Sequence, residues 1–160
     1  RLAARLTAVG EAPVQDLCPL GSWHAHLCTI DLRQCAMLCH DQSGYLIVWA
    51  GLKMADFPAF GERCRDRLLA TLRADGFSPV TLKKVTLALG PVQYDCLTDS
   101  SIRVFLRTAR EALNARLAGE RSIMDLESST LSAELNRQTV EFRGQRLKSV
   151  EGFRASLAAL

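Results

Sequence analysis

The segment YLIVWAG, residues 45–51, is almost continuously apolar and constrains the fold of this chain more than any other feature. A strand with apolar side chains on both of its sides must be covered on both faces. The run is far shorter than the roughly 18–20 residues that cross a membrane. No charged-then-apolar leader opens the chain. The sequence therefore predicts a buried strand in a domain that makes no contact with a membrane.

Two further strands are predicted upstream of this segment. The stretches WHAHLCTI and CAMLCH, between residues 23 and 40, flank the polar stretch DLRQ, which is typical of a β-hairpin. We expect the turn at Leu32 and Arg33, so that Ile30 faces Cys35 on the neighbouring strand. With the apolar segment that follows, the hairpin predicts a three-stranded antiparallel meander.

Two long segments, 56–75 and 98–118, carry apolar residues every three or four positions and predict amphipathic helices. Asp56 and Thr98 are their expected N-terminal caps. The stripe of the first is expected at Phe60, Cys64, Leu68 and Leu72, and that of the second at Ile102, Phe105, Leu106, Ala109, Leu113 and Leu117.

Shorter elements are expected in the rest of the chain. Residues 2–9 and 149–160 have the pattern of short terminal helices, with one or two helical turns at 131–137. Residues 85–90 and 92–96 suggest short strands, 119–130 a loop, and 140–147 a tight hairpin through Arg143 and Gly144. Strands followed by helices favour a single α+β domain over residues 1–160, with a small antiparallel meander packed against two main helices.

Residues 23–40 hold three cysteines and all three histidines. In the expected register, one face of the hairpin carries four side chains that could bind zinc, namely His26, Cys28, Cys35 and Cys39. The same face also carries Ile30 and Met37, and no C-x₂-C spacing occurs. The favoured interpretation is buried, reduced thiols in a cytoplasmic protein, without metal or cofactor. A structural zinc site is the alternative.

An enzyme is a weaker interpretation. His24, Arg33 and His40 could line a pocket, but no acid–base partner follows from the spacing. Cys96, just before an expected helix start, is the best placed cysteine for a nucleophile, and a packed thiol is the simpler interpretation. No nucleophile, zinc-protease or phosphate-loop motif occurs. We therefore predict no catalytic residues.

Arg103, Arg107 and Arg110 lie at i, i+4 and i+7 of the second long helix. Arginine rows can bind phosphates, which makes a nucleic-acid-associated protein the main alternative function. The net charge of +3 is compatible with this partner without requiring it. No aromatic residues alternate with the arginines, so the stacking pattern of single-strand binders is missing.

Trp23, Tyr45 and Trp49 concentrate large aromatic side chains on the predicted meander. Such residues are enriched at interfaces, although ordinary sheet core explains them as well. The leading interpretation is a non-enzymatic binding module that uses these residues with His24 and Arg33. An apolar sheet face left open by the helices would suit a homodimer, a protein partner or a ligand groove.

The meander resembles an uncharacterised bacterial family of domains of unknown function. The shared pattern is a Trp-x-Ala-(Asn/His)-Leu opening, an Arg before the second strand, and an aliphatic third strand. Here these positions are Trp23, Ala25, His26, Leu27, Arg33 and residues 45–48. The resemblance implies a cytoplasmic bacterial α+β domain and supplies no catalytic residue. Gln34 departs from the pattern, and a strand that precedes the first helix in the family is missing or trimmed here.

Overall fold

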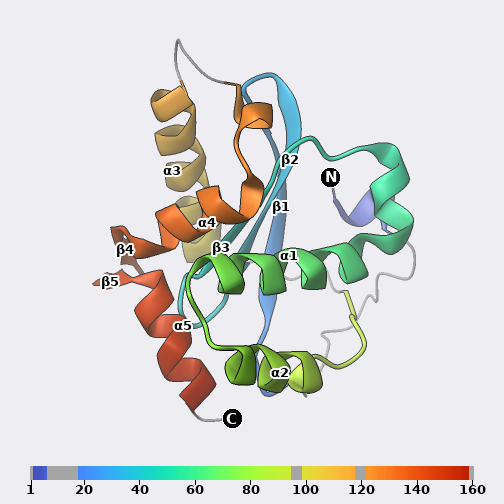
Figure 1. The fold of residues 1–160 in the computed structure, drawn as a ribbon. Coiled ribbons are helices and arrows are strands. Elements are labelled where there is room, and N and C mark those ends of the chain that lie inside the picture. The colour runs from blue at the N-terminus through green and yellow to red at the C-terminus, as the bar shows by residue number, and fades with distance from the viewer. Residues whose placement is uncertain (1, 7–17, 95–98, 118–121, 159–160) are drawn as a thin grey trace.

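The computed structural model describes residues 2–6, 18–94, 99–117 and 122–158, and it has the predicted α+β architecture. Its centre is an antiparallel sheet of three strands in the order β1–β2–β3. These strands are β1 (Trp23–Ile30), β2 (Arg33–His40) and β3 (Leu46–Trp49). The predicted meander is therefore confirmed, and helices surround it (Figure 1).

The hairpin turn lies one residue earlier than predicted. Asp31 and Leu32 have φ angles of +49° and +56° and form a two-residue turn, and Ile30 pairs with Arg33. Two consecutive left-handed residues match the twist of a hairpin, although Asn-Gly or Asp-Gly is the usual sequence. The expected pairing of Ile30 with Cys35 is wrong by two residues. Because strand side chains alternate, a two-residue error leaves every side chain on its predicted face.

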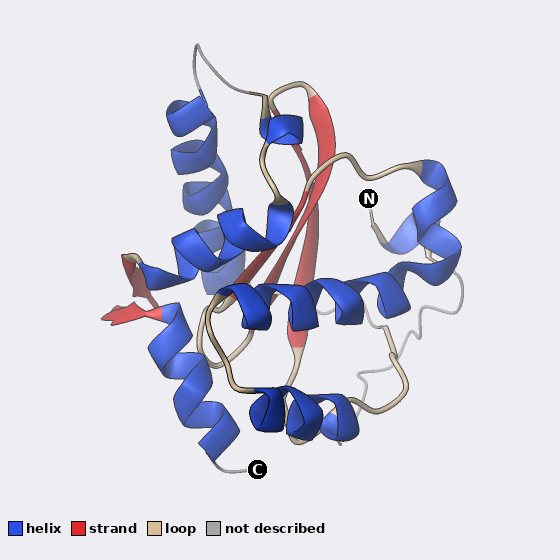
Figure 2. Cartoon of the chain, in the orientation of Figure 1, coloured by secondary structure: helices blue, strands red, loops and turns tan. Residues whose placement is uncertain are grey.

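Helices and a second, two-stranded sheet complete the described structure (Figure 2). The α-helices are α1 (Phe60–Ala74), α2 (Pro79–Ala88), α3 (Ser100–Leu117), α4 (Ser128–Arg137) and α5 (Ser149–Ala158). The second sheet pairs β4 (Thr139–Phe142) with β5 (Gln145–Lys148), as predicted. Short 3₁₀ helices are η1 (Ala3–Arg5), η2 (Met54–Ala59) and η3 (Ile123–Asp125).

Both faces of the meander are covered. One face, with Cys35, Met37 and Cys39, packs against the apolar stripe of α3 and against residues of η3, α4 and β4. The other face, which includes Leu38 and Ile47, packs against α1, α2 and α5. The stripes predicted for α1 and α3 face this core. All four residues of β3 are buried, as the apolar run requires.

A row of polar side chains from α4 closes the outer edge of β3. The backbone N–H of Leu46 donates to Asn136 Oδ1 over 2.7 Å, and that of Val48 donates to Ser132 Oγ over 2.9 Å. Ala50 N lies 3.5 Å from Ser128 Oγ. Four helical residues rise about 6 Å, close to the length of two strand residues, so the two rows stay in step. An unpaired strand edge is a pairing hazard, and α4 removes it here.

The short strand expected at residues 85–90 is wrong, because this segment belongs to α2. Ser78 Oγ accepts a hydrogen bond from the backbone N–H of Thr81, and Pro79 follows at the first helical position. The alternation of Val85, Leu87 and Leu89 suggested a strand, but only Val85 among them is buried. Of the segment 92–96, the described part holds a single bridge residue.

The starts of the two long helices also differ from prediction. Asp56 lies in η2, where its carboxylate accepts from the backbone N–H of Lys53 at 2.6 Å, and α1 begins only at Phe60. Asp99 holds the start of α3, accepting from Ser101 N over 2.7 Å, whereas the predicted cap Thr98 lies outside the described residues. The loop expected at 119–130 contains η3 and the first turn of α4. Of the helix expected at 2–9, only η1 is described.

None of the described helices combines the length and the apolar character that crossing a membrane requires.

Candidate functional site

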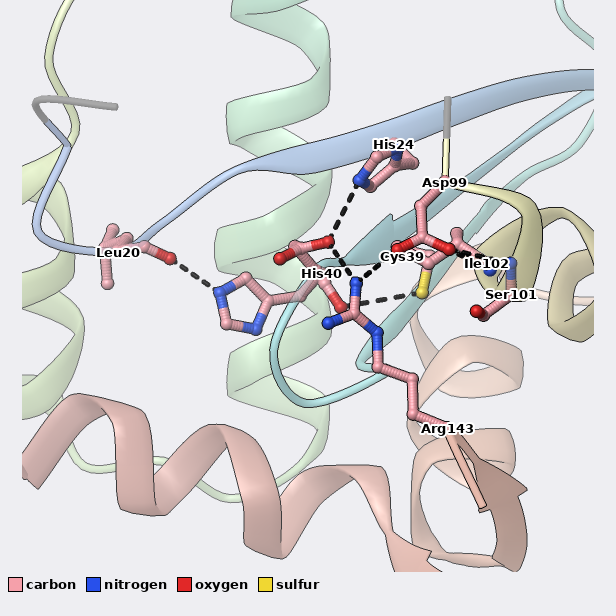
Figure 3. Close-up of polar contacts among 9 residues, drawn as sticks. Leu20, His24, Cys39, His40, Asp99, Ser101, Ile102 and Arg143 are labelled. Atoms are coloured by element: carbon pink, nitrogen blue, oxygen red, sulfur yellow. Dashed lines mark hydrogen bonds and ion pairs between the residues drawn. The ribbon is translucent and has the colours of Figure 1, made fainter. Parts of the chain in front are cut away.

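Four polar side chains meet where β1 begins, β2 ends and α3 starts (Figure 3). His24 Nε2 lies 3.2 Å from Asp41 Oδ1, and Nη2 of Arg143 lies 2.7 Å from both Asp41 Oδ1 and Asp99 Oδ2. The other carboxylate oxygen of Asp99 accepts from the first turn of α3. Arg143 bridges the two carboxylates, and His24 contacts one of them, so the cluster has the properties of a structural network that joins the two sheets and α3.

His40 lies beside this cluster and is fully buried. Its Nε2 is 2.6 Å from the carbonyl oxygen of Leu20, which can only accept, so Nε2 donates. In the neutral ring Nδ1 then accepts from the hydroxyl of Ser43, 2.8 Å away. Both ring nitrogens are therefore engaged inside the domain, and His40 is not placed to exchange a proton with a ligand.

Arg33 lies at the opposite end of the hairpin from both histidines. His24 pairs with Cys39, whereas Arg33 pairs with Ile30. Six residues of strand span about 20 Å. The structure therefore brings His24 and His40 to one end of the sheet without Arg33, and the three residues do not form one site.

The cysteines of the meander are buried and free. Burial raises the pKa of Cys28 to about 11, and it also raises the pKa of Cys35 and Cys39. On α1, burial raises the pKa of Cys64 to about 12. Nucleophiles and metal ligands need the thiolate, which these surroundings disfavour. Cys96 lies outside the described residues.

The four side chains of the zinc alternative do not converge. Cys28 and Cys35 are directly opposite one another, but His26 pairs with Met37 and is exposed, and Cys39 lies two residues further along β2. Among the residues that the structure describes, no three His, Cys, Asp or Glu side chains are grouped to hold a metal ion.

The sheet aromatics lie mostly inside the domain. Tyr45 and Trp49 are 0% and 2% exposed. The Tyr45 ring stacks on Phe153 with centroids 4.7 Å apart, and its hydroxyl donates to Asp75 Oδ2 over 2.6 Å. Only Trp23 of the three aromatic residues is partly exposed. The open aromatic face expected on the meander is therefore absent from the described structure.

Helix α2 presents a different exposed surface, which we call the α2 face: Val80, Lys83, Lys84 and Leu87. These positions follow one another at i, i+3, i+4 and i+7 and share one side of the helix. Val80 is 70% and Leu87 78% exposed, while Val85 on the opposite side is buried. The helix contains no acidic residue. In Figure 1, α2 lies below α1 at the bottom of the view, with α5 beside it.

A groove borders the α2 face on each side. The one toward α1 has a volume of about 500 Å³, and its walls are Arg73, Phe77, Pro79, Leu82, Lys83 and Thr86. The one toward α5 includes Lys84 and Arg154, whose guanidinium lies 4.8 Å from the centroid of the Phe77 ring. Each groove therefore combines apolar walls with two basic side chains.

The sequence interpretation missed the α2 face because it assigned part of this helix to a strand. A usable signal was present at Ser78 and Pro79, since Ser followed by Pro is a frequent helix start. Counted from there, Leu82, Val85 and Leu89 lie on one side, and Val80 and Leu87 on the other. The exposed apolar residues could then have been recognised.

On α3, Arg103 and Arg107 are exposed and Arg110 is half-buried. None of these three arginines takes part in an ion pair between described residues. The basic side chains that do are His24, Arg63, Arg116, Arg137, Arg143 and Lys148. Glu111, the acidic residue next to Arg110 on the same helix, is in none of these ion pairs. The row of arginines is therefore not neutralised within the described part of the chain.

A family model described as Domain of unknown function (DUF6933) matches residues 1–150. No curated protein matches the chain.

Proposed function

Because the chain belongs to the DUF6933 family, whose function is unknown, its own surfaces are the guide to its function. We propose that it is a non-enzymatic interaction module that binds an acidic segment of a partner protein through the α2 face. The observation that carries the proposal is the exposure of Val80 and Leu87 on a helix whose only charges are Lys83 and Lys84.

Burial of the apolar side chains of the α2 face provides a driving force for binding. Burial of a Val or Leu side chain contributes about 2 kcal/mol relative to leaving it exposed. Val80 and Leu87 are both mostly exposed and lie two turns apart on the helix. A partner that covers both gains this energy, and the two bordering grooves offer space for its own side chains.

The charges of the α2 face select the partner. Lys83 and Arg73 line the groove toward α1, and Lys84 and Arg154 line the groove toward α5. Carboxylates complement these walls, and complementary charges speed association and exclude basic partners. Two-fold pairing of this face with a second copy would bring Lys83 and Lys84 against their counterparts, which is unfavourable. We therefore favour an acidic partner over a homodimer at this surface.

An enzyme is less well supported by the same structure. The histidines and Arg33 do not share a site, and burial raises the pKa of the described meander thiols, which disfavours the thiolate. Free thiols suit a reducing compartment, which supports a cytoplasmic location, and the resemblance of the meander supports a bacterial source.

The test uses a synthetic amphipathic peptide that carries Leu on one side of a helix and Glu on the other. Its binding is measured by fluorescence anisotropy. We expect the wild-type protein to bind it and Leu87→Glu or Val80→Glu to weaken binding at least tenfold. Val104→Glu is the matched control, because Val104 is 52% exposed on α3, away from the α2 face. Exposed substitutions of this kind change stability little, so folding is preserved.

Three outcomes would contradict the proposal. The control Val104→Glu could lose as much binding as Leu87→Glu, or a peptide with Lys in place of Glu could bind equally well. Binding to anionic lipid vesicles without binding to the acidic peptide would assign the α2 face to a membrane surface instead.

A further inference from the structure

The exposed basic side chains of α3 lie on a different helix from the α2 face. We infer that Arg103, Arg107 and Arg110, together with His26 of β1, form a site for two or three consecutive phosphates of a nucleic-acid backbone. We call these four residues the α3 row.

The three arginines form a straight row beside the buried stripe of α3. Helical steps of 100° place Arg107 and Arg110 within about 40° of Arg103 around the helix. Their Cα atoms rise by about 6 Å and then about 4.5 Å along the axis. The row thus spans about 10 Å, which suits contact with a short stretch of one strand. Arginine is the residue best matched to phosphate oxygens.

The row runs along β1. The backbone N–H of Asp31, at the end of β1, lies 3.4 Å from Oδ1 of Asn114, one turn beyond Arg110 on the same side of α3. Helix α3 packs against β1, on the face of the sheet that carries His26 and Cys28, and the charge of Arg110 acts to lower the pKa of both. His26 is exposed, so its ring can serve as a fourth side chain of the site.

Carboxylates bound the α3 row at both ends. Asp99 lies just before α3 and is paired with Arg143. Asp31 lies near the other end, where its N–H contacts Asn114 and its carboxylate accepts from Ser122 Oγ over 2.7 Å. These negative charges limit the length of backbone that can lie on the row. We therefore expect contact with about three phosphates and weak binding at physiological ionic strength, because affinity depends on the number of phosphates neutralised.

Protonation of His26 is coupled to this contact. Partial burial of the ring, in a residue that is exposed as a whole, and the charge of Arg110 lower the pKa of His26, which favours the neutral ring in the free protein. A phosphate beside the ring favours the protonated form, and binding therefore strengthens as pH falls. The groups around His26 are Arg110 on α3, His24 and Cys28 on its own face of β1, and the uncharged Met37 on β2. His24 is already paired with Asp41.

The experiment measures binding to a fluorescein-labelled 20-base-pair DNA duplex and to a single strand of equal length, by anisotropy. Three phosphate contacts predict a salt slope of about −2.7 for the duplex, so affinity should fall about 40-fold when salt rises fourfold. The triple change Arg103→Ala, Arg107→Ala and Arg110→Ala should remove most of that slope. The charge-matched control changes Arg116, Arg146 and Lys148 to Ala and should keep it.

The pH arm compares wild type with His26→Gln between pH 7.5 and pH 5.5. We expect wild type to bind the duplex more tightly at the lower pH, and His26→Gln to lose most of that gain.

The inference is overturned if no duplex or single strand binds at 50 mM salt, or if the control triple variant loses as much affinity as the α3 variant. Equal affinity for poly-glutamate would assign the α3 row to acidic proteins. An unchanged pH response in His26→Gln would remove His26 from the site.

Discussion

Asn136 of α4 makes hydrogen bonds to both backbone groups of Leu46 in β3. Leu46 N donates to Oδ1 over 2.7 Å, and Nδ2 donates to Leu46 O over 2.9 Å. Asn136 is completely buried, so water cannot replace it. One amide side chain thus acts as the neighbour that an edge strand otherwise lacks.

Replacing Asn136 by Ala should destabilise the protein strongly. The change leaves a buried N–H and a buried C=O of Leu46 without partners, and each unpaired group costs about 1–3 kcal/mol. We expect Asn136→Ala to lower the free energy of unfolding by about 2–4 kcal/mol in urea denaturation. Asn114→Ala is the control, since Asn114 is exposed and makes one long contact at 3.4 Å, and should cost under about 0.5 kcal/mol. Equal effects of the two changes would show that the β3 edge does not depend on α4.

The N-terminal cap of α4 should be sensitive to acid. Glu127 accepts from the backbone N–H of Ser129 and Thr130 at 3.1 and 2.7 Å. Slight burial raises the pKa of Glu127, but hydrogen bonds from these two residues outweigh it and lower the pKa from 4.5 to about 2. A depressed carboxyl pKa contributes stability that is present above about 4.5 and is lost as pH falls toward 2.

Glu127→Gln removes this charge while keeping an acceptor. We expect the variant to be less stable than wild type by up to about 1 kcal/mol at pH 7, because the cap is exposed and screened. The difference should shrink as pH falls from 4.5 toward 2. Denaturation curves of both proteins at pH 7 and pH 3 measure it. A difference that stayed constant or grew at pH 3 would show that the carboxylate is not what stabilises the cap.

The meander could be predicted because its signal is local. The apolar residues 45–51 can be accommodated only in a covered strand, and the alternation in residues 23–40 fixes which side chains face which side. The turn was harder to place, because Asp31 and Leu32 lack the glycine that usually marks left-handed positions. Leu32 takes φ +56° with 95% of its surface exposed, and no propensity rule favours that choice.

The candidate surfaces could be predicted only in part. The spacing of the α3 arginines was readable, since it depends on one helix. Whether carboxylates neutralise them depends on tertiary contacts, such as Asp99 meeting Arg143 of the distant second hairpin. The α2 face was not predicted because alternating apolar residues fit a strand and a helix alike over a short stretch. Likewise, the burial of Tyr45 and Trp49 depends on α1 and α5, which come later in the chain.

The buried thiols of Cys28, Cys35 and Cys39 and the half-buried thiol of Cys64 should resist modification until the protein unfolds. Burial raises the pKa of Cys28 to about 11 and that of Cys64 to about 12, so neither is a thiolate at pH 8. In a variant with Cys18→Ser and Cys96→Ser, the four remaining thiols should react with a disulfide reagent slowly in buffer and completely in denaturant. Fast reaction of the folded variant would mean that the thiols are accessible and reactive.

Metal content tests the zinc alternative directly. Because His26 is exposed and pairs with Met37 rather than with Cys39, we expect purified protein to contain far less than one zinc per chain by elemental analysis. Chelator treatment should leave the unfolding midpoint unchanged. One tightly bound metal per chain would establish a site in spite of the separated ligands.

The two tryptophans should differ in their access to solvent. Trp49 is 2% exposed and stacks on Phe60 with centroids 5.4 Å apart, while Arg67 lies 4.5 Å from its ring. Trp23 is partly exposed. With acrylamide as quencher, Trp23→Phe should leave an emission that is hardly quenched, and Trp49→Phe should leave one that is moderately quenched. The reverse order would mean that β3 is less well covered than the structure shows.

The same coverage leads to a prediction about the oligomeric state. The sequence suggests a homodimer as one way to bury an open face of the meander. In the structure, helices of the same chain cover Tyr45 and Trp49. The basic α2 face repels its own copy. We therefore expect a monomer by size-exclusion chromatography with light scattering at micromolar concentration. A dimer whose formation shields Trp23 from acrylamide would instead place a two-fold interface at the start of β1. A dimer broken by Leu87→Glu would place it on α2, and would count against an acidic partner there.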